Sequence, residues 1–132
     1  MSSVAPLIAV LDDEPEMRKA LGRLLLTRGF RVGAHATGEE LLGSLSSVLP
    51  DCVVLDLHMP GINGFDVLAR FASRWPQVPI VVITGHDESD TAERARRLGA
   101  AAYLRKPVDE TALLGAIETA IRDAKNSTGA KN

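Results

Sequence analysis

The sequence has little cysteine, few aromatic residues, no long apolar run and no marked excess of one charge. Cys52 is its single cysteine, so an intrachain disulfide is excluded and core packing has to hold the fold, as is usual in a reducing compartment. No apolar run is long enough to cross a membrane, and the run 4–11 ends in acidic residues with no basic segment before it, unlike a signal peptide. A formal net charge of −2 gives no reason to expect direct nucleic-acid binding. We therefore expect a cytoplasmic protein that contacts neither a membrane nor nucleic acid directly.

Short apolar runs alternate with amphipathic stretches five times along the chain. This pattern is typical of a parallel sheet covered by helices on both faces, and it predicts an α/β fold of the (βα)5 type. The segments 52–55 and 80–83 are continuously apolar, which is typical of strands that are buried on both faces of a sheet. The strands are expected at 7–11, 30–34, 52–55, 80–83 and 101–104.

The amphipathic stretches predict five helices, and two of them carry clear boundary signals. Pro15 suits the start of the first helix and Gly29 its end. Thr37 with Glu40 three residues later is a capping-box signature for a second helix that runs through Leu45. Apolar residues at helical spacing place the remaining helices around 65–72, 92–98 and 113–121.

The length of 132 residues fits one domain with a single core. We place this domain at residues 5–123. The polar segment 124–132 loses the apolar periodicity, so we expect a frayed tail there.

Polar side chains follow four of the five expected strands. They are Asp12 with Asp13, Asp56, Thr84 and Lys106. In open parallel sheets, ligands bind outside the carboxyl ends of the strands where the strand order reverses, so these side chains should line one crevice. A doubly wound sheet of order 2-1-3-4-5 makes the first and third strands neighbours, which would bring the Asp12 and Asp13 pair opposite Asp56.

Such a cluster of carboxylates requires positive charge. Two carboxylates about 4 Å apart repel by about 4 kcal/mol at an effective dielectric constant near 20. A hard divalent cation with oxygen ligands would relieve this repulsion, and Mg²⁺ suits a site of a few carboxylates that also shares its ligands with a phosphate. Lys106 would supply a second positive charge.

Four segments in this order resemble the response-regulator receiver domain of two-component systems. They are VLDDEP (10–15), VLDLHMPGING (54–64), ITGH (83–86) and GAAAYLRKP (99–107). The resemblance extends from Leu7 to about Ile121 and is most similar in detail to receivers of the nitrogen-fixation regulator type. It implies the flavodoxin-like form of the (βα)5 fold and a protein whose only chemistry is its own phosphorylation and autodephosphorylation.

The resemblance also implies a role for each residue of the predicted crevice. Asp56 would accept the phosphoryl group. Asp13, Asp56 and the backbone carbonyl of His58 would hold Mg²⁺, with Asp12 acting through water. A carboxylate can attack phosphorus directly, so little acid–base machinery is needed.

Three further roles concern the phosphorylated state. Thr84 would donate a hydrogen bond from its hydroxyl to a phosphoryl oxygen. Lys106 would pair with the phosphoryl group, and the peptide bond between Lys106 and Pro107 would be cis. Tyr103 would change rotamer and alter the surface of the fourth helix, fifth strand and fifth helix.

The resemblance implies partners as well. A sensor histidine kinase or a phosphotransfer protein would donate the phosphoryl group. The switched surface would bind a downstream protein, an output domain if this chain is a fragment, or a second copy in a homodimer. The sequence does not identify the kinase, the output or the oligomeric state.

Simpler interpretations exist for single residues. Asp12 and Asp13 could cap the first helix, Thr84 could satisfy a loop amide, and Tyr103 could simply pack as a half-buried strand residue. For Asp12 and Asp13, the convergence of the acidic residues on one edge of the sheet favours a role in the metal site over helix capping.

Alternative functions conflict with particular residues. A phosphatase of the haloacid-dehalogenase type needs an acid two residues after its nucleophile, and His58 stands there. A nucleotide or flavin binder would cradle phosphate after the first strand, where this chain offers Asp-Asp-Glu-Pro. A zinc site from His35, His58 and His86 lacks ligand-type spacing.

Overall fold

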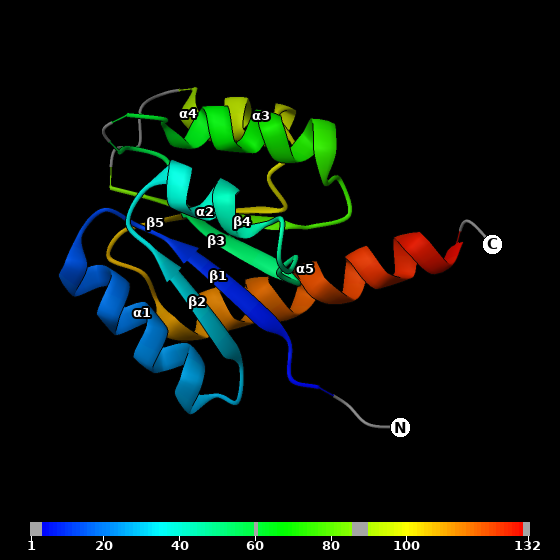
Figure 1. The fold of residues 1–132 in the computed structure, drawn as a ribbon, viewed down its shortest axis with the longest axis horizontal. Helices are drawn as coiled ribbons and strands as arrows, with labels where there is room; N and C mark the ends of the chain where they lie inside the picture. The colour runs from blue at the N-terminus through cyan, green and yellow to red at the C-terminus, as the bar shows by residue number, and fades with distance from the viewer. Residues whose placement is uncertain (1–3, 60, 86–89, 131–132) are drawn as a thin grey trace.

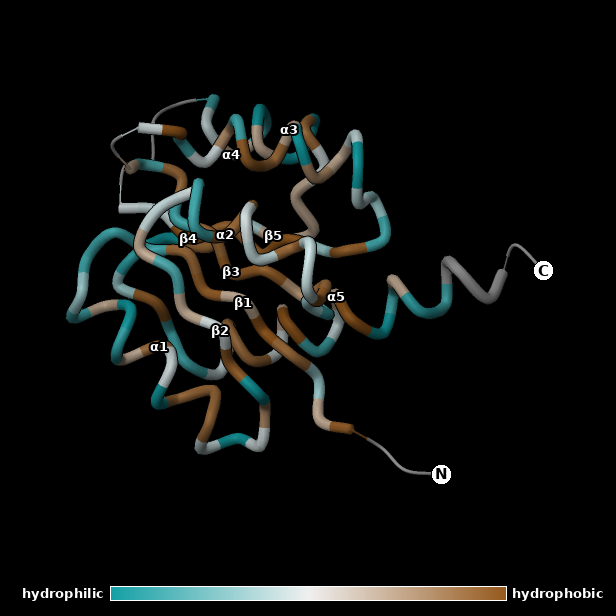
Figure 2. Tube along the Cα trace, in the orientation of Figure 1, coloured by the Kyte–Doolittle hydropathy of each residue, from teal (hydrophilic) through white to brown (hydrophobic). Residues whose placement is uncertain are grey.

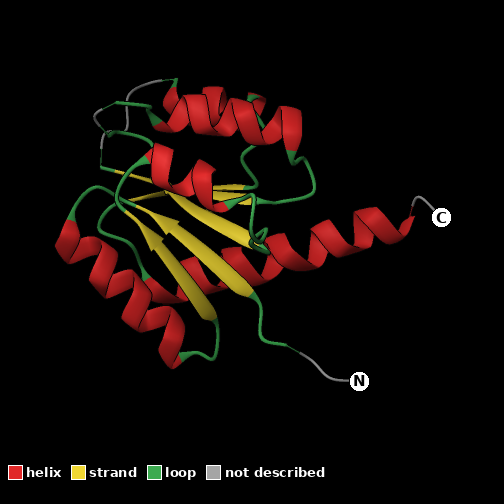
Figure 3. Ribbon diagram, in the orientation of Figure 1, coloured by secondary structure: helices red, strands yellow, loops and turns green. Residues whose placement is uncertain are grey.

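The computed structural model describes residues 4–59, 61–85 and 90–130, with side chains described through residue 126. Within these residues, strands and helices alternate and form one five-stranded parallel sheet of order β2-β1-β3-β4-β5 (Figure 1 and Figure 3). This confirms the predicted (βα)5 fold and strand order. The elements are β1 (Leu7–Leu11), α1 (Pro15–Thr27), β2 (Arg31–His35), α2 (Gly38–Ser44), β3 (Cys52–Asp56), α3 (Gly64–Arg74), β4 (Ile80–Thr84), α4 (Thr91–Arg97), β5 (Ala102–Arg105) and α5 (Glu110–Ala130).

The sheet separates two apolar cores. Helices α1 and α5 lie on one side of the sheet and α2, α3 and α4 on the other, and the hydrophobic residues follow the central strands (Figure 1 and Figure 2). Alternate strand residues supply the two cores: Val53 and Leu55 face the α2, α3 and α4 side, and Val54 faces the α1 and α5 side. The buried side chains of β3 and β4 explain why these strands read as continuous apolar runs.

The predicted helix boundary signals are present. Pro15 is the first residue of α1, and Gly29 takes a φ of +91°, a left-handed conformation that glycine adopts without steric cost. Thr37 caps α2, where its Oγ1 accepts a 3.1 Å hydrogen bond from the Glu40 amide. Glu40 Oε1 in turn accepts from the amide of Ala36 at 3.0 Å, one residue before the expected capping-box position.

The start of α3 packs directly against the end of β3. The Gly64 amide donates to the Leu57 carbonyl at 2.9 Å. A Cβ atom at residue 64 would lie 2.8 Å from the Asp56 carbonyl oxygen, closer than real Cβ contacts allow. Only glycine fits here without a shift of the backbone, so the chain that follows Asp56 is held in a narrow space.

Several element boundaries differ by one residue from the sequence predictions, including both ends of β2, which spans Arg31–His35. Asp56 and Thr84 are the last residues of β3 and β4, each paired in the sheet ladder, where we expected both to lie just past the strand ends. Strand β5 begins one residue later than predicted, at Ala102. Apolar patterning ends before the backbone ladder does, so it underestimates how far a parallel strand continues.

Helix α5 is longer than the sequence predicts. The structure continues it through Ala130, whereas we expected regular structure to end near Asp123. Once a helix is formed, each further residue adds a backbone hydrogen bond, so loss of the apolar stripe does not by itself end it. The predicted domain boundary at Asp123 stays a prediction. No helix among the described residues combines the length and apolar character that a membrane span requires.

Candidate metal and phosphoryl site

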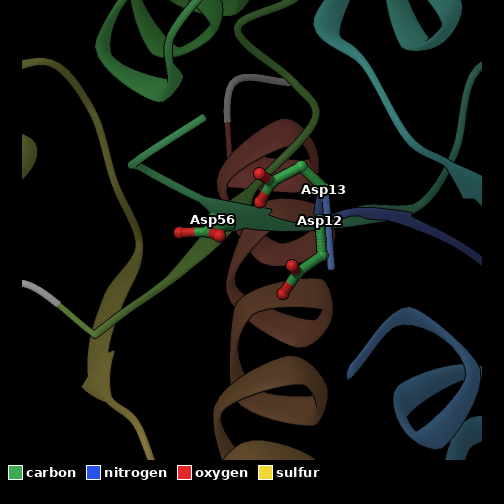
Figure 4. A group of neighbouring side chains, drawn as sticks. All are labelled: Asp12, Asp13 and Asp56. Atoms are coloured by element: carbon green, nitrogen blue, oxygen red, sulfur yellow. The ribbon is translucent and has the colours of Figure 1, made fainter. Parts of the chain in front are cut away.

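Three carboxylates converge at the carboxyl ends of β1 and β3. Asp12 and Asp13 directly follow β1, and Asp56 ends the neighbouring strand β3. One oxygen from each of the three lies within 4.8 Å of the others, and Figure 4 shows the three side chains gathered at these strand ends. The sequence prediction that these acids meet is therefore confirmed in geometry.

Asp12 is the most buried acid of the cluster, with none of its surface exposed. Its Oδ1 accepts a 3.0 Å hydrogen bond from the Glu14 amide at the entry to α1, so it does support the helix start. Its Oδ2 is buried, and among the described residues its partner is the Lys106 ammonium at 3.2 Å. A buried carboxylate is costly unless positive charge compensates it, and a bound metal cation would add to the charge that Lys106 supplies.

Lys106 places its ammonium between three acids. Its Nζ lies 3.2 Å from Asp12 Oδ2, 3.3 Å from Glu14 Oε1 and 3.4 Å from Asp56 Oδ2. The residue follows β5, its amide donates to the Thr84 carbonyl at 2.8 Å, and its bond to Pro107 is cis, as expected. Burial alone would lower the pKa of Lys106, but the attraction of Asp56 and Asp12 outweighs it and raises that pKa. Lys106 is therefore a cation at neutral pH.

At Asp56, unlike at Lys106, burial has a larger effect on the pKa than the opposite charge of the ion-pair partner. Burial raises the pKa of the Asp56 carboxyl, and repulsion from Asp12 adds to this effect. The amide of His58, which donates to Asp56 Oδ1 at 3.1 Å, and the Lys106 ammonium oppose the rise without cancelling it. An ion pair alone would lower the pKa of the acid, so at Asp56 the effect of burial outweighs the attraction of Lys106.

The donor set fits a hard divalent cation. It consists of three carboxylates, and Asp12 is the one that is completely buried. All of these ligands are oxygen atoms, as Mg²⁺ prefers. Among the described residues, this is the one group of histidine, cysteine and acidic side chains with a spacing that could hold a metal ion. The spacing gives no support to a histidine zinc site, and His86 lies outside the described residues.

Thr84 lies beside this cluster on β4, next to β3. Its side chain is completely buried, and its Oγ1 is 3.1 Å from Nδ1 of His58. Tyr103 lies on β5 opposite Val82, is partly buried and packs against the core on the α2, α3 and α4 side. The predicted rotamer change of Tyr103 stays a prediction.

Sequence reasoning missed two contacts. Glu14, whose side chain is 66% exposed, joins the Lys106 ion pairs, and its place after Asp12 and Asp13 was the available signal. No sequence pattern indicated the hydrogen bond between the His58 ring and Thr84. Farther away, the Arg94 guanidinium stacks 3.9 Å above the centre of the Phe65 ring and links α4 to α3.

Comparison with known proteins points to one family. The family model described as the response regulator receiver domain matches residues 8–118. The transcriptional regulatory protein FixJ of Bradyrhizobium diazoefficiens is 37% identical over 118 residues, covering 89% of this chain and 58% of that protein. The DNA-binding transcriptional regulator NtrC of Salmonella typhimurium is 34% identical over 115 residues, covering 87% of this chain and 24% of NtrC. The chain thus spans about half or less of these relatives.

A solved structure agrees with this result. The response regulator receiver domain protein from Clostridium thermocellum has a TM-score of 0.85 and 33% sequence identity, and the match covers 92% of this chain and 98% of that one. The family model covers most of the chain, including every residue of the acidic cluster and Lys106. This chain therefore belongs to the response-regulator receiver domain family of two-component systems.

Proposed function

We propose that this receiver accepts a phosphoryl group on Asp56 from a sensor histidine kinase or a phosphotransfer protein in a Mg²⁺-dependent reaction. The observation that carries the proposal is the convergence of Asp12, Asp13 and Asp56, together with the Lys106 ammonium that lies within 3.4 Å of two of them. Oxygen ligands for a metal and a positive charge for a phosphoryl group thus meet at one nucleophilic carboxylate.

The chemistry follows from this arrangement. A carboxylate oxygen of Asp56 attacks phosphorus and forms an O–P bond, while the bond from phosphorus to the donor nitrogen or oxygen breaks and the donor retains the electron pair. Mg²⁺, held by Asp13, Asp56 and the His58 carbonyl with Asp12 acting through water, would neutralise charge on the phosphoryl oxygens. Lys106 supplies the second positive charge.

The Lys106 contacts support its role in this reaction. Its ammonium pairs with Asp12 and Asp56 at the same time, and its side chain is only 17% exposed. Because the carboxylates hold its charge and shield it from water, the ammonium is oriented before a phosphoryl group arrives. Such preorganised charge is effective because little reorganisation is needed during the reaction.

The proposed output is a change of the surface formed by α4, β5 and α5. A new phosphoryl group would draw the Thr84 hydroxyl towards it and let Tyr103 turn inward, because both residues lie on the adjacent strands β4 and β5. We propose that the changed surface binds a downstream protein, an output domain or a second copy of the receiver in the cytoplasm. The relatives named as transcriptional regulators are longer than the matched region, which is consistent with an output domain.

A phosphatase of the haloacid-dehalogenase type is disfavoured. It requires a general acid two residues after the nucleophile, and here that residue is His58, whose ring is hydrogen-bonded to Thr84. Steady turnover of small phosphoesters by the purified chain would favour this alternative.

Mass spectrometry after treatment with acetyl phosphate and Mg²⁺ tests the proposal. The wild-type chain should gain one phosphoryl group, and Asp56→Asn should gain none. Asp123→Asn makes the same chemical change at an exposed residue of α5 and should behave as wild type. An adduct on Asp56→Asn equal to that of the wild type, or equal labelling when Mg²⁺ is chelated, would contradict the proposal.

A further inference from the structure

His58 connects the proposed phosphoacceptor with the proposed switch residue. Its amide donates to Asp56 Oδ1 at 3.1 Å, and its ring Nδ1 lies 3.1 Å from the Thr84 hydroxyl. The backbone and the ring of one residue thus contact two different members of the site. The ring contact involves the completely buried hydroxyl that is expected to move on phosphorylation.

The loop that carries His58 is fixed on both sides. The Leu57 amide donates to the Ile83 carbonyl at 3.3 Å, and the Leu57 carbonyl accepts from the Gly64 amide at 2.9 Å. These backbone bonds hold His58 next to β4 independently of its side chain. The ring can therefore be replaced without removing the carbonyl that is proposed to bind the metal.

We propose that His58 is a positioning residue that holds Thr84 in the unphosphorylated state. In this arrangement the Thr84 hydroxyl donates its single proton to Nδ1, and the ring carries its own proton on Nε2. A hydroxyl that donates to the ring cannot donate the same proton to a phosphoryl oxygen. This inference rests on the proposed function and adds a side-chain competitor for the switch hydroxyl.

The competition has a direct consequence for the switch. When the phosphoryl group arrives, Thr84 must exchange its bond to His58 for a bond to the phosphoryl oxygen. The bond to His58 therefore favours the unphosphorylated arrangement. Given the usual net strength of one hydrogen bond, its removal should shift this equilibrium roughly 2- to 10-fold towards the phosphorylated arrangement.

Titration with beryllofluoride, a phosphoryl analogue, in the presence of Mg²⁺ measures this shift. Binding can be followed by ¹⁹F NMR on the complete chain. His58→Leu removes the ring acceptor and should bind beryllofluoride roughly 2- to 10-fold more tightly than the wild type. His58→Asn offers an amide oxygen near the position of Nδ1 and should restore the wild-type affinity.

Two further measurements separate positioning from a general effect on the loop. In a Thr84→Val background, the His58→Leu substitution should no longer change the affinity for beryllofluoride, because the hydroxyl that the ring holds is absent. In the wild type without beryllofluoride, the ¹⁵N spectrum of the His58 ring should show an unprotonated Nδ1 and a protonated Nε2. A protonated Nδ1 in a neutral ring would overturn the inference.

The outcomes for this inference and for the proposed function are distinct. If wild type and His58→Leu bind beryllofluoride equally, or if the difference persists in the Thr84→Val background, the positioning role fails and the proposed function stands. If the wild-type chain does not bind beryllofluoride with Mg²⁺ at all, the proposed function fails and this inference fails with it.

Discussion

Cys52 and Asp56 begin and end the same strand, and both are buried, yet their surroundings differ. Burial raises the pKa of the Cys52 thiol to about 12, and it also raises the pKa of the Asp56 carboxyl. At Cys52 the groups that oppose the effect are backbone hydrogen-bond partners at Val53 and Val81, whereas at Asp56 the His58 backbone amide is joined by a charged group, the Lys106 ammonium. Burial alone gives an unreactive core residue, whereas burial with an opposing charge gives a nucleophile that can be used.

Removal of the opposing charge should have the largest effect. Lys106→Met leaves Asp12 and Asp56 without their cation and should lower the rate of phosphorylation by acetyl phosphate about 100-fold, because charge stabilisation in the transition state is lost. Mass spectrometry over time measures the rate, and circular dichroism checks that the variant is folded. Lys19→Met, on an exposed position of α1, is the matched control and should keep the wild-type rate.

At the other end of β3, a polar substitution tests the core. Cys52→Ser places a hydroxyl in a fully buried apolar position, and it should lower the free energy of unfolding by about 2 kcal/mol. Urea denaturation measures the loss. Cys52→Ala, which adds no polar group, should lose less. Equal stability of the serine variant and the wild type would mean that this end of the strand tolerates polar groups as the other end does.

Added Mg²⁺ should stabilise the folded chain by binding the acidic cluster at the carboxyl end of β3. At a concentration about ten times its dissociation constant, Mg²⁺ should raise the free energy of unfolding of the wild type by about 1.4 kcal/mol. Asp13→Asn removes one proposed ligand and should lose most of this gain, whereas Asp123→Asn should keep it. Thermal unfolding with and without chelator measures the effect, and an equal gain in both variants would argue against the cluster as the metal site.

The pH dependence of stability should reveal the effect of burial on the Asp56 carboxyl. Since its pKa in the folded chain is raised, the folded state binds its proton more tightly than the unfolded state, in which the ordinary value is 3.8. In Mg²⁺-free buffer, the stability of the wild type relative to Asp56→Asn should therefore fall as pH rises from 3.8 through the folded pKa. Urea denaturation of both proteins across this range measures the difference. A stability difference that rises with pH over this range would contradict the assignment.

The sequence was sufficient to predict the site residues whose positions follow from the alternation of strands and helices. Asp12, Asp13 and Asp56 follow or end apolar runs, so the topology of a parallel sheet brings them together without knowledge of side-chain conformations. Lys106 was predictable on the same grounds. The strand order of the sheet and the similarity to a solved receiver structure confirmed the fold class that periodicity had indicated.

The missed features depend on contacts that no periodicity encodes. The bond of His58 to Thr84 joins a loop residue to a strand end 26 positions away, and the choice of ring rotamer decides it. Glu14 reaches Lys106 from 92 positions away through a flexible side chain. The extension of α5 rests on backbone hydrogen bonds, which are common to all sequences.

The glycine that opens α3 has a consequence for anyone who redesigns this chain. The backbone of Asp56 and Leu57 lies so close to Gly64 that even a methyl group would displace it. In a library that randomises every residue, this position should accept no alternative, although its residue bears no functional group. Intolerance to substitution at Gly64 would reflect its close packing against the backbone of Asp56 and Leu57. A search for reactive groups based on mutational sensitivity alone would wrongly include Gly64.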